Sequence, residues 1–327
     1  MKVLVTGADG LLGGNLVREL ISRDFSVRVF IQPGSKSPTL KDLPVERISG
    51  DLLADEGILA DAVSGCDAVF HCAAITDLWA DPDLVWSVNL EGTRRILDAS
   101  LSARVKRLVY VGSASSFQFG TKDNPGDESR SFAPAYKGVP YMESKHQAMN
   151  LVREYISEKG LDAVIVAPTF MLGPYDFRPS SGELIQQYIK RGLRFGSPGG
   201  RNFACVHDVA KAMVSALERG VSGECYILGG ENLSYLEFFS RVAKVAGIKP
   251  PLFVIPKSMV LLAGSLGRVF EIISGKPALF NLQMARFSCL GTYYSSARAI
   301  KELGMPQTRI ESAIEESIQS LKEYGHL

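Results

Sequence analysis

The sequence has little that would tie it to a nucleic acid or to an oxidising compartment. Its five cysteines (66, 72, 205, 225 and 289) are scattered, without a Cys-x-x-Cys pair, so we expect reduced thiols rather than disulfides and no metal site. Its 36 lysines and arginines nearly balance 35 acids, so no overall field attracts nucleic acid. The amino terminus runs directly into glycines, unlike a signal peptide. These absences predict a cytoplasmic protein whose partner is a small molecule.

A long apolar run is also missing. The most membrane-like stretch, SMVLLAGSLGRVFEIISG at 258–275, is interrupted by Arg268 and Glu271 before it reaches the roughly 18 apolar residues of a membrane span. We therefore predict a buried or amphipathic helix there, without stable membrane insertion. The alternatives are a weak membrane contact or a lining for an apolar substrate.

Short β-branched runs alternate with longer segments of helical spacing in the first half of the chain. The runs are KVLVTG, FSVRVFI, DAVFHCAA, RLVYVGS and DAVIVAPT. Apolar strands that alternate with helices are typical of a parallel sheet covered on both faces. The sequence therefore predicts an α/β protein with a doubly wound Rossmann sheet, which binds its ligand at the carboxyl ends of the strands.

A glycine-rich turn, VTGADGLLGG, follows the first predicted strand. It spaces Gly7, Gly10 and Gly13 as G-x-x-G-x-x-G. Gly7 permits a tight turn, Gly10 lets a pyrophosphate approach the backbone, and Gly13 lets the helix lie close to the strand. The free N–H groups at Leu11 and Leu12 face the phosphates. This turn predicts a dinucleotide site.

The end of the second predicted strand bears on the choice of cofactor. NAD binding favours an acidic residue there, but the segment VRVFIQPGSK has none. Gln32, Ser35 and Lys36 are placed to hold a 2′-phosphate, with Arg28 as a less certain helper. We predict NADP(H) over NAD(H). Asp51, after the third strand, either contacts the adenine or caps the next helix.

The stretch PYMESKHQAM places Tyr141 and Lys145 four residues apart, on one face of a predicted helix. A free tyrosine has a pKa near 10, and a nearby ammonium favours the phenolate. The pair is either an ordinary solvated helix face or the acid–base centre of an enzyme. After a βαβ series that opens with this glycine turn, the second interpretation is favoured.

These motifs resemble those of the extended short-chain dehydrogenase/reductases, the NAD-dependent epimerase/dehydratase superfamily, over nearly the whole chain. The matching segments are TGADGLLG, HCAA (71–74), VNLEGT with Asn89, YMESK and APTFMLGP (167–174). Within the superfamily, AAITDLWADP, YILGGENLS and MARFSCLGTYYSSARAIKELG most resemble the bacterial dihydroflavonol-4-reductase-like group, which includes hopanoid-associated epimerases and lies near the 3β-hydroxysteroid dehydrogenases.

The resemblance implies catalytic roles. Tyr141 would be the general acid, and Lys145 would bind the nicotinamide ribose and lower the tyrosine pKa. Asn89 would support the active-site strand. A serine after RLVYV would hydrogen-bond the substrate oxygen: the match to VKRLVYVGS favours Ser113, whereas counting back from Gly120 points to Ser115.

The resemblance also implies binding residues and a homodimer formed through two helices. The cofactor contacts would be Thr6, Gly7, Asp9, Gly10, Leu11, Leu12, Gln32, Lys36, Asp51, Leu52, Cys72, Ala73, Ala74, Thr76, Val111, Tyr141, Lys145, Pro168 and Phe170. The candidate substrate contacts are Ser115, Tyr136 and Tyr175.

These assignments predict that the chain is divided into two domains. Residues 1–174 would form the dinucleotide-binding Rossmann domain, to which the chain returns at about 203–230. Residues 175–202 and 231–327 would form a smaller, mostly helical substrate lobe.

Three functions are compatible with this division. The favoured one is an NADP(H)-dependent oxidoreductase that reduces a ketone on an apolar small molecule. The alternative is a nucleotide-sugar epimerase or dehydratase with tightly held NAD, for which Arg191, Arg194 and Arg201 could bind a diphosphate. A cofactor-binding regulator without turnover is disfavoured, because such proteins typically lose Tyr141 or Lys145.

Overall fold

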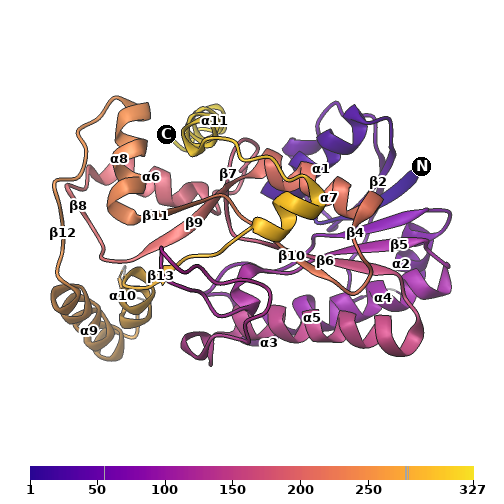
Figure 1. The fold of residues 1–327 in the computed structure, drawn as a ribbon, viewed down its shortest axis with the longest axis horizontal. Helices are drawn as coiled ribbons and strands as arrows, with labels where there is room; N and C mark the ends of the chain where they lie inside the picture. Colours follow the sequence, from indigo (N-terminus) through magenta and orange to yellow (C-terminus); the bar gives the residue numbers. More distant parts are fainter. Residues whose placement is uncertain (55, 277, 279) are drawn as a thin grey trace.

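A computed structural model describes residues 1–54, 56–276, 278 and 280–327. Its larger part is built on a seven-stranded sheet in the order β10-β6-β5-β4-β1-β2-β3, and all neighbouring strands run parallel (Figure 1). The strands are β1 (Lys2–Thr6), β2 (Ser26–Ile31), β3 (Glu46–Ser49), β4 (Ala68–His71), β5 (Arg107–Val111), β6 (Ala163–Pro168) and β10 (Cys225–Leu228). The predicted α/β class with a doubly wound parallel sheet is confirmed.

Helices cover both faces of this sheet because its strands are apolar on both sides. Val3 and Val5 belong to a core with α1 (Leu11–Ser22) and α7 (Val206–Arg219), whereas Leu4 points into a second core. That second core is closed by α2 (Glu56–Val63), α4 (Gly92–Ser102) and α5 (Pro140–Lys159), with the short α3 (Pro82–Trp86) against α5. Alternating side chains along each buried strand thus feed two helical layers.

The register of the sheet brings four strand ends to one edge. Thr6 lies opposite His71, His71 opposite Tyr110, and Val111 opposite Val166. The segments that leave β1, β4, β5 and β6 therefore start next to one another. This edge is where a doubly wound sheet is expected to bind its ligand.

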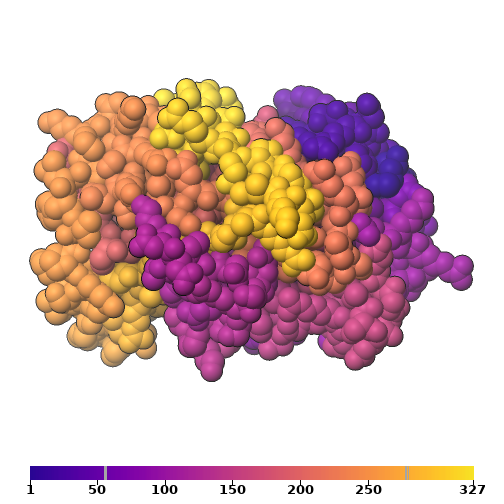
Figure 2. All heavy atoms as spheres, viewed as in Figure 1, coloured from indigo at the N-terminus to yellow at the C-terminus, as the bar shows by residue number. Residues whose placement is uncertain are grey.

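The smaller part combines helices with short strands. A four-stranded sheet holds β7 (Phe170–Leu172), β9 (Gly200–Cys205), β11 (Glu231–Ser234) and β13 (Gly291–Thr292), and β8 (Phe195–Gly196) pairs with β12 (Phe253–Val254). The helices are α6 (Gly182–Arg191), α8 (Tyr235–Ala246), α9 (Lys257–Ser274), α10 (Leu282–Ser288) and α11 (Ile310–Glu323). Figure 2 shows this part at the left and the last segment of the chain, in yellow, lying between it and the larger part.

The two parts are joined by hydrogen bonds as well as by the chain. Tyr294 of the smaller part donates from its hydroxyl to the Phe117 carbonyl oxygen of the larger part (3.2 Å), and Asn202 fixes Tyr294 by donating to its carbonyl oxygen (3.2 Å). The exact limits of two domains stay a prediction, since the strand β10 belongs to the large sheet while the adjoining β9 and β11 belong to the small one.

The membrane-like stretch forms a helix, α9, but a mostly exposed one. Only Val260 and Gly264 of α9 are buried, so of the two expected forms, a buried or an amphipathic helix, the buried one is wrong. Within the described ranges, no helix has the length and apolarity needed to cross a membrane.

Candidate active site

The first turn of α5 carries Tyr141 and is fixed by a hydrogen-bond chain. Pro140 occupies the first helical position, where its fixed backbone angle suits a helix start. The Ser144 hydroxyl donates to the Tyr141 carbonyl oxygen (3.0 Å) and accepts from the Asn89 amide (3.0 Å). The Asn89 side chain also bonds both backbone groups of Ile75, at 2.8 and 3.0 Å. Asn89 thus ties α5 to the segment after β4.

Ser113 lies at the tyrosine. Its hydroxyl hydrogen-bonds the Tyr141 phenol and lies 2.8 Å from the hydroxyl of Ser115. The Ser115 backbone N–H also donates to the Ser113 hydroxyl, at 3.3 Å. Ser113 is half-buried and Ser115 is buried, so Ser113 is the one of the two that reaches the phenol.

Lys145 is buried and faces the end of β5. Its ammonium donates to the Val111 carbonyl oxygen (2.6 Å) and lies 4.8 Å from the centre of the Tyr110 ring. Burial lowers the pKa of Lys145 to about 8, because desolvation penalises the charged amine. The amine is therefore close to its titration range at neutral pH.

The pKa of the Tyr141 phenol differs from the expectation. Burial raises the pKa of Tyr141 above 10, and the hydrogen bond with Ser113 offsets this only in part. The expected lowering of this pKa by Lys145 is not found. The phenol is thus protonated at neutral pH.

The glycine turn has space for a ligand at one of its three glycines. A Cβ at Gly7, which has φ +64°, would lie 2.7 Å from the Ala73 backbone, and a Cβ at Gly13 would lie 2.1 Å from the Gly7 carbonyl oxygen. Both glycines are required by the fold itself. Gly10 is exposed, and its nearest contact would be an ordinary 3.5 Å. The turn therefore fits a phosphate group that approaches Gly10 at the start of α1.

A buried network holds the neighbouring HCAA segment against this turn. The Thr6 hydroxyl lies 2.8 Å from His71 Nδ1 and accepts from the Ala73 N–H at 3.2 Å, while His71 Nε2 lies 3.1 Å from the Thr93 hydroxyl. Burial lowers the pKa of His71 to about 3, so this histidine is neutral and structural. Burial also raises the pKa of Cys72 to about 12, which makes an inert thiol.

At the predicted adenosine end lies Arg178, a residue that the sequence did not single out. The Asp9 carboxylate accepts from the Ser35 hydroxyl (2.7 Å) and pairs with Arg178 (2.9 Å). Gln32 and Lys36 are exposed beside Ser35 in sequence. Arg178 is 169 residues from Asp9 in the chain, so no local motif points to it.

Two other predicted contacts have structural partners. The Asp51 side chain accepts from the Leu53 N–H (2.8 Å). This bond closes a local turn before α2, so Asp51 does not cap that helix. Arg28 donates to the carbonyl oxygens of Asp61, Ala62 and Ser64 and pairs with Glu46 at 2.9 Å. The helper role predicted for Arg28 is therefore wrong, because its guanidinium braces the loop before β4.

The remaining predicted cofactor contacts follow the strand ends. Pro168 and Val111 end β6 and β5, and Leu52 is buried. Ala74 is half-buried and Thr76 is exposed after β4. The described residues contain no cluster of three or more histidine, cysteine or acidic side chains suited to a metal ion.

Aromatic side chains and one arginine gather where the two parts meet. Tyr136 is buried, and its ring lies 5.6 Å from that of Phe119 and 6.2 Å from that of Phe287. Arg201 donates to the Tyr235 hydroxyl (2.8 Å) and lies 4.9 Å from the centre of the Phe170 ring. Phe170 and Tyr136 thus border a partly apolar region that a substrate could use.

Tyr175 lies elsewhere. Its ring packs under the Arg18 guanidinium of α1, 3.6 Å from the ring centre, and its backbone N–H donates to Ser320. Its role as a substrate contact stays a prediction.

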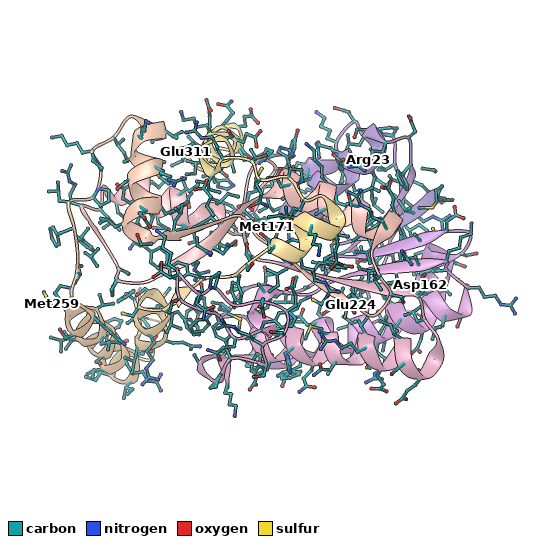
Figure 3. All side chains as sticks on the ribbon, in the orientation of Figure 1. Arg23, Asp162, Met171, Glu224, Met259 and Glu311 are labelled. Atoms are coloured by element: carbon teal, nitrogen blue, oxygen red, sulfur yellow. The ribbon has the colours of Figure 1, made fainter. Side chains whose placement is uncertain are left out.

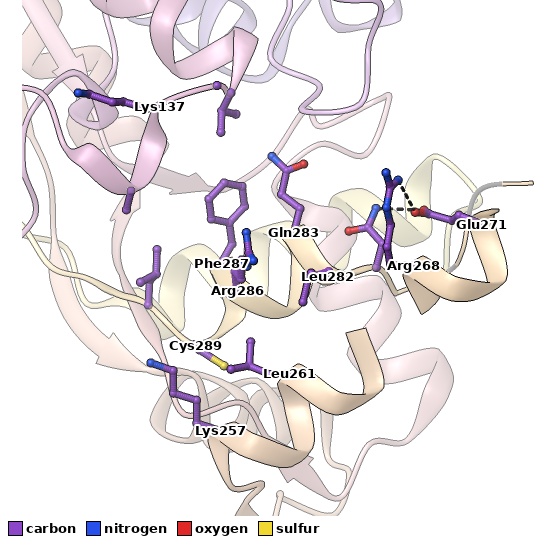
Figure 4. Close-up of a pocket in the computed structure, with 15 residues that line it drawn as sticks. Lys137, Lys257, Leu261, Arg268, Glu271, Leu282, Gln283, Arg286, Phe287 and Cys289 are labelled. Atoms are coloured by element: carbon purple, nitrogen blue, oxygen red, sulfur yellow. Dashed lines mark hydrogen bonds and ion pairs between the residues drawn. The ribbon is translucent and has the colours of Figure 1, made fainter. Parts of the chain in front are cut away.

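A cavity of about 760 Å³ lies next to this region rather than at the phenol. It is bounded by the loop that leads into α5 and by α9 and α10 (Figure 4). Val139, two residues before Tyr141, lines it together with Leu261, Leu282 and Phe287. Neither Tyr141 nor Lys145 is among its lining residues.

The doubly wound sheet, the glycine turn after β1 and the Tyr-x-x-x-Lys helix define an NAD(P)-dependent enzyme of the short-chain dehydrogenase/reductase type. The model of the NAD dependent epimerase/dehydratase family matches residues 3–229, and the chain belongs to this family.

Relatives and solved structures agree with this assignment. A putative dihydroflavonol 4-reductase of Synechocystis sp. is 30% identical over 99% of this chain and 95% of its own length. Sterol demethylase protein B of Methylococcus capsulatus is 31% identical over 99% of both chains. A nucleoside-diphosphate-sugar epimerase from Pseudomonas aeruginosa has a TM-score of 0.82 and 26% identity, covering 100% of this chain and 99% of its own.

Proposed function

We propose that this chain is an NADP(H)-dependent oxidoreductase that reduces a ketone on a cyclic or otherwise apolar small molecule, like a dihydroflavonol reductase or a hydroxysteroid dehydrogenase. One observation carries the proposal: α5 places Lys145 at the end of β5, 2.6 Å from the Val111 carbonyl oxygen, and Tyr141 next to Ser113. A phenol that stays protonated at neutral pH is suited to give a proton to an alkoxide as it forms.

Each residue has a separate task in this reaction. Bound NADP(H) supplies the hydride. The Ser113 hydroxyl donates to the substrate carbonyl oxygen and keeps it at the phenol, and Tyr141 gives its proton to that oxygen. Lys145 would hold the nicotinamide ribose through its ammonium. The open backbone at Gly10 and the N–H groups of Leu11 and Leu12 would hold the diphosphate.

The preference for NADP(H) rests on the charges at the adenosine end. The strand β2 ends at Ile31, and Gln32 follows, so the end of this strand offers no acidic side chain to the ribose hydroxyls, and the nearby Asp9 is paired with Arg178. Lys36 is exposed and supplies one cation. Arg178 supplies a second, because it and Ser35 both donate to the Asp9 carboxylate. A 2′-phosphate would compete with Asp9 for Arg178 and Ser35.

The second candidate, a nucleotide-sugar epimerase or dehydratase with tightly held NAD, is favoured by Arg201. Its guanidinium is partly buried and donates to the Tyr235 hydroxyl, and among the described residues no ion pair of Arg201 with a carboxylate is found. A cation without an acidic partner at this border suits an anionic substrate group. The aromatic side chains around it favour the less polar substrate.

The cellular setting follows from the same proposal. We place the enzyme in the cytoplasm, where its five thiols, all free in the structure, would stay reduced. We also propose a homodimer, by analogy with related enzymes, which analytical ultracentrifugation would test.

The test of the proposed function is the cofactor and its turnover. The purified protein is analysed by native mass spectrometry, and then supplied with NADPH and a panel of steroid, flavonoid and aliphatic ketones. We expect that the protein releases no cofactor and that it then oxidises NADPH only when a ketone is present. NAD⁺ retained at near-full occupancy, with no ketone-dependent turnover, would replace the reductase by the epimerase or dehydratase.

A further inference from the structure

The helix α9 carries its large apolar side chains on the side that faces solvent. Seven of them are between 50% (Val269) and 80% (Ile273) exposed, and six of the seven, all but Ile272, share one side of the helix. We call this set the outer face of α9, and it consists of Met259, Leu262, Leu266, Val269, Phe270 and Ile273. At 3.6 residues per turn these positions lie within an arc of about 100°, so they form one stripe.

The inner face of α9 is made of small residues. A Cβ at Gly264 would lie 2.4 Å from the Ala285 Cβ of α10, and a Cβ at Gly267 would lie 2.1 Å from the Phe280 carbonyl oxygen. The glycines let α10 pack closely against α9. The pattern is the reverse of a surface helix in water, which buries its large apolar residues and exposes its polar ones.

The outer face continues into the segment before α9. Leu252, Phe253 and Val254 are also exposed, and the Phe253 ring lies 6.4 Å from that of the exposed Phe195 on β8. The elements β8, β12 and α9 lie at the same end of the molecule (Figure 1), and Met259 marks its outer edge in Figure 3. Soluble monomers rarely expose so many large apolar side chains together.

Positive charge is concentrated in the part of the chain that carries this face. Between residues 249 and 290 the chain has five cations and one acid, whereas the whole chain has a net charge of +1. The acid, Glu271, accepts from the Asn281 side chain (3.3 Å) and pairs with Arg268 (3.4 Å). The five cations, all exposed, are Lys249, Lys257, Arg268, Lys276 and Arg286.

We propose that the outer face of α9 docks the protein on the surface of a lipid bilayer that contains anionic lipid, with α9 lying in the plane of the interface. An exposed apolar stripe on a segment rich in lysine and arginine is the chemistry of interfacial helices. A second copy of the chain fits less well, because a two-fold contact through this end of the molecule would bring two segments of the same net positive charge together.

The cavity lies behind the docked helix. Leu261 of α9 and Leu282 of α10 line it, and its opposite wall is the loop that leads into α5 (Figure 4). This part of the inference rests on the proposed function: an apolar ketone dissolved in the bilayer would reach the enzyme through this end of the molecule. The docking itself depends on neither cofactor nor substrate.

The test uses the full chain and vesicles, without cofactor or substrate. Co-sedimentation is measured with vesicles of phosphatidylcholine alone and with vesicles that also contain phosphatidylglycerol. We expect binding to the mixed vesicles that weakens with salt, and weaker binding to phosphatidylcholine alone. The double variant Leu262→Glu/Leu266→Glu should lose more than tenfold in partitioning, since burial of each large apolar side chain contributes about a factor of ten.

A matched variant separates this site from a general effect of charge. Val221→Glu/Ile300→Glu adds the same charge at two other exposed apolar residues and should bind vesicles like the wild type. Equal losses in both variants, or no binding of the wild type to mixed vesicles, would overturn the proposal. So would a wild-type dimer that the α9 variant alone converts to monomers. Ketone reduction in vesicle-free buffer tests the proposed function separately.

Discussion

The Lys145 ammonium donates a 2.6 Å hydrogen bond to the main-chain oxygen of Val111, the last residue of β5. This contact joins the α5 helix to the edge of the sheet where the dinucleotide is expected. One turn away on the same helix, burial raises the pKa of the Tyr141 phenol.

The first prediction concerns pH. Because burial lowers the pKa of Lys145 to about 8, the amine is charged below that pH and neutral above it. We expect the affinity for NADPH to fall above about pH 8 with the loss of one proton. Isothermal titration calorimetry across the alkaline range measures this, and Lys145→Met should bind weakly without the pH step. A constant wild-type affinity would contradict the assignment.

The second prediction compares two glycines of one turn. Gly13→Ala places a methyl group 2.1 Å from the Gly7 carbonyl oxygen and should lower the free energy of unfolding by about 1–3 kcal/mol or more. Gly10→Ala meets only an ordinary contact at 3.5 Å and should keep its stability. Its NADPH affinity should nevertheless fall at least tenfold. Thermal melts and binding isotherms check both, and unchanged binding by Gly10→Ala would argue against a phosphate at this position.

The third prediction separates two serines. Ser113→Ala removes the hydroxyl at the phenol and should lower kcat by about 10²–10³-fold, the typical loss for one donor to a developing oxyanion. Ser115→Ala leaves that hydroxyl in place and removes only its partner at 2.8 Å. Its loss should be smaller. Steady-state kinetics on the same ketone distinguishes the two, and the reverse order would make Ser115 the substrate-binding serine.

The fourth prediction concerns the adenosine end. Arg178→Ala should weaken NADPH binding about tenfold and leave NADH binding nearly unchanged, if Arg178 holds the 2′-phosphate. Asp9→Asn removes the acid that pairs with Arg178 at 2.9 Å and should strengthen NADPH binding. Parallel isotherms with both cofactors measure the preference. Wild-type protein that binds NADH more tightly than NADPH would refute the NADP(H) assignment.

The sequence predicts the sheet and the glycine turn because both depend on local patterns: apolar strands, helical spacing and glycines after the first strand. It does not predict Arg178, which meets Asp9 only through the folded chain. It misplaces Arg28, because the sequence does not show in which direction a long side chain on a strand extends. Here the guanidinium reaches the loop before β4 instead of the cofactor end of the sheet. The raised pKa of Tyr141 depends on burial by distant segments of the chain. The four-residue spacing of Tyr141 and Lys145 contains no information about that burial.

The exposed face of α9 was also beyond the sequence pattern. The residues between 258 and 275 predict a helix, but which side faces α10 depends on where Gly264 and Gly267 meet Ala285 and Phe280. The large side chains were therefore expected inside and lie outside.

The central claim is that Tyr141 gives the proton in ketone reduction, and Tyr141→Phe tests it most directly. This change removes the phenol oxygen and little else, so the variant should fold and bind NADPH like the wild type. We predict that kcat on a ketone substrate falls by about 10²–10⁴-fold, the usual contribution of a general acid. Turnover at the wild-type rate, with NADPH binding intact, would contradict the account.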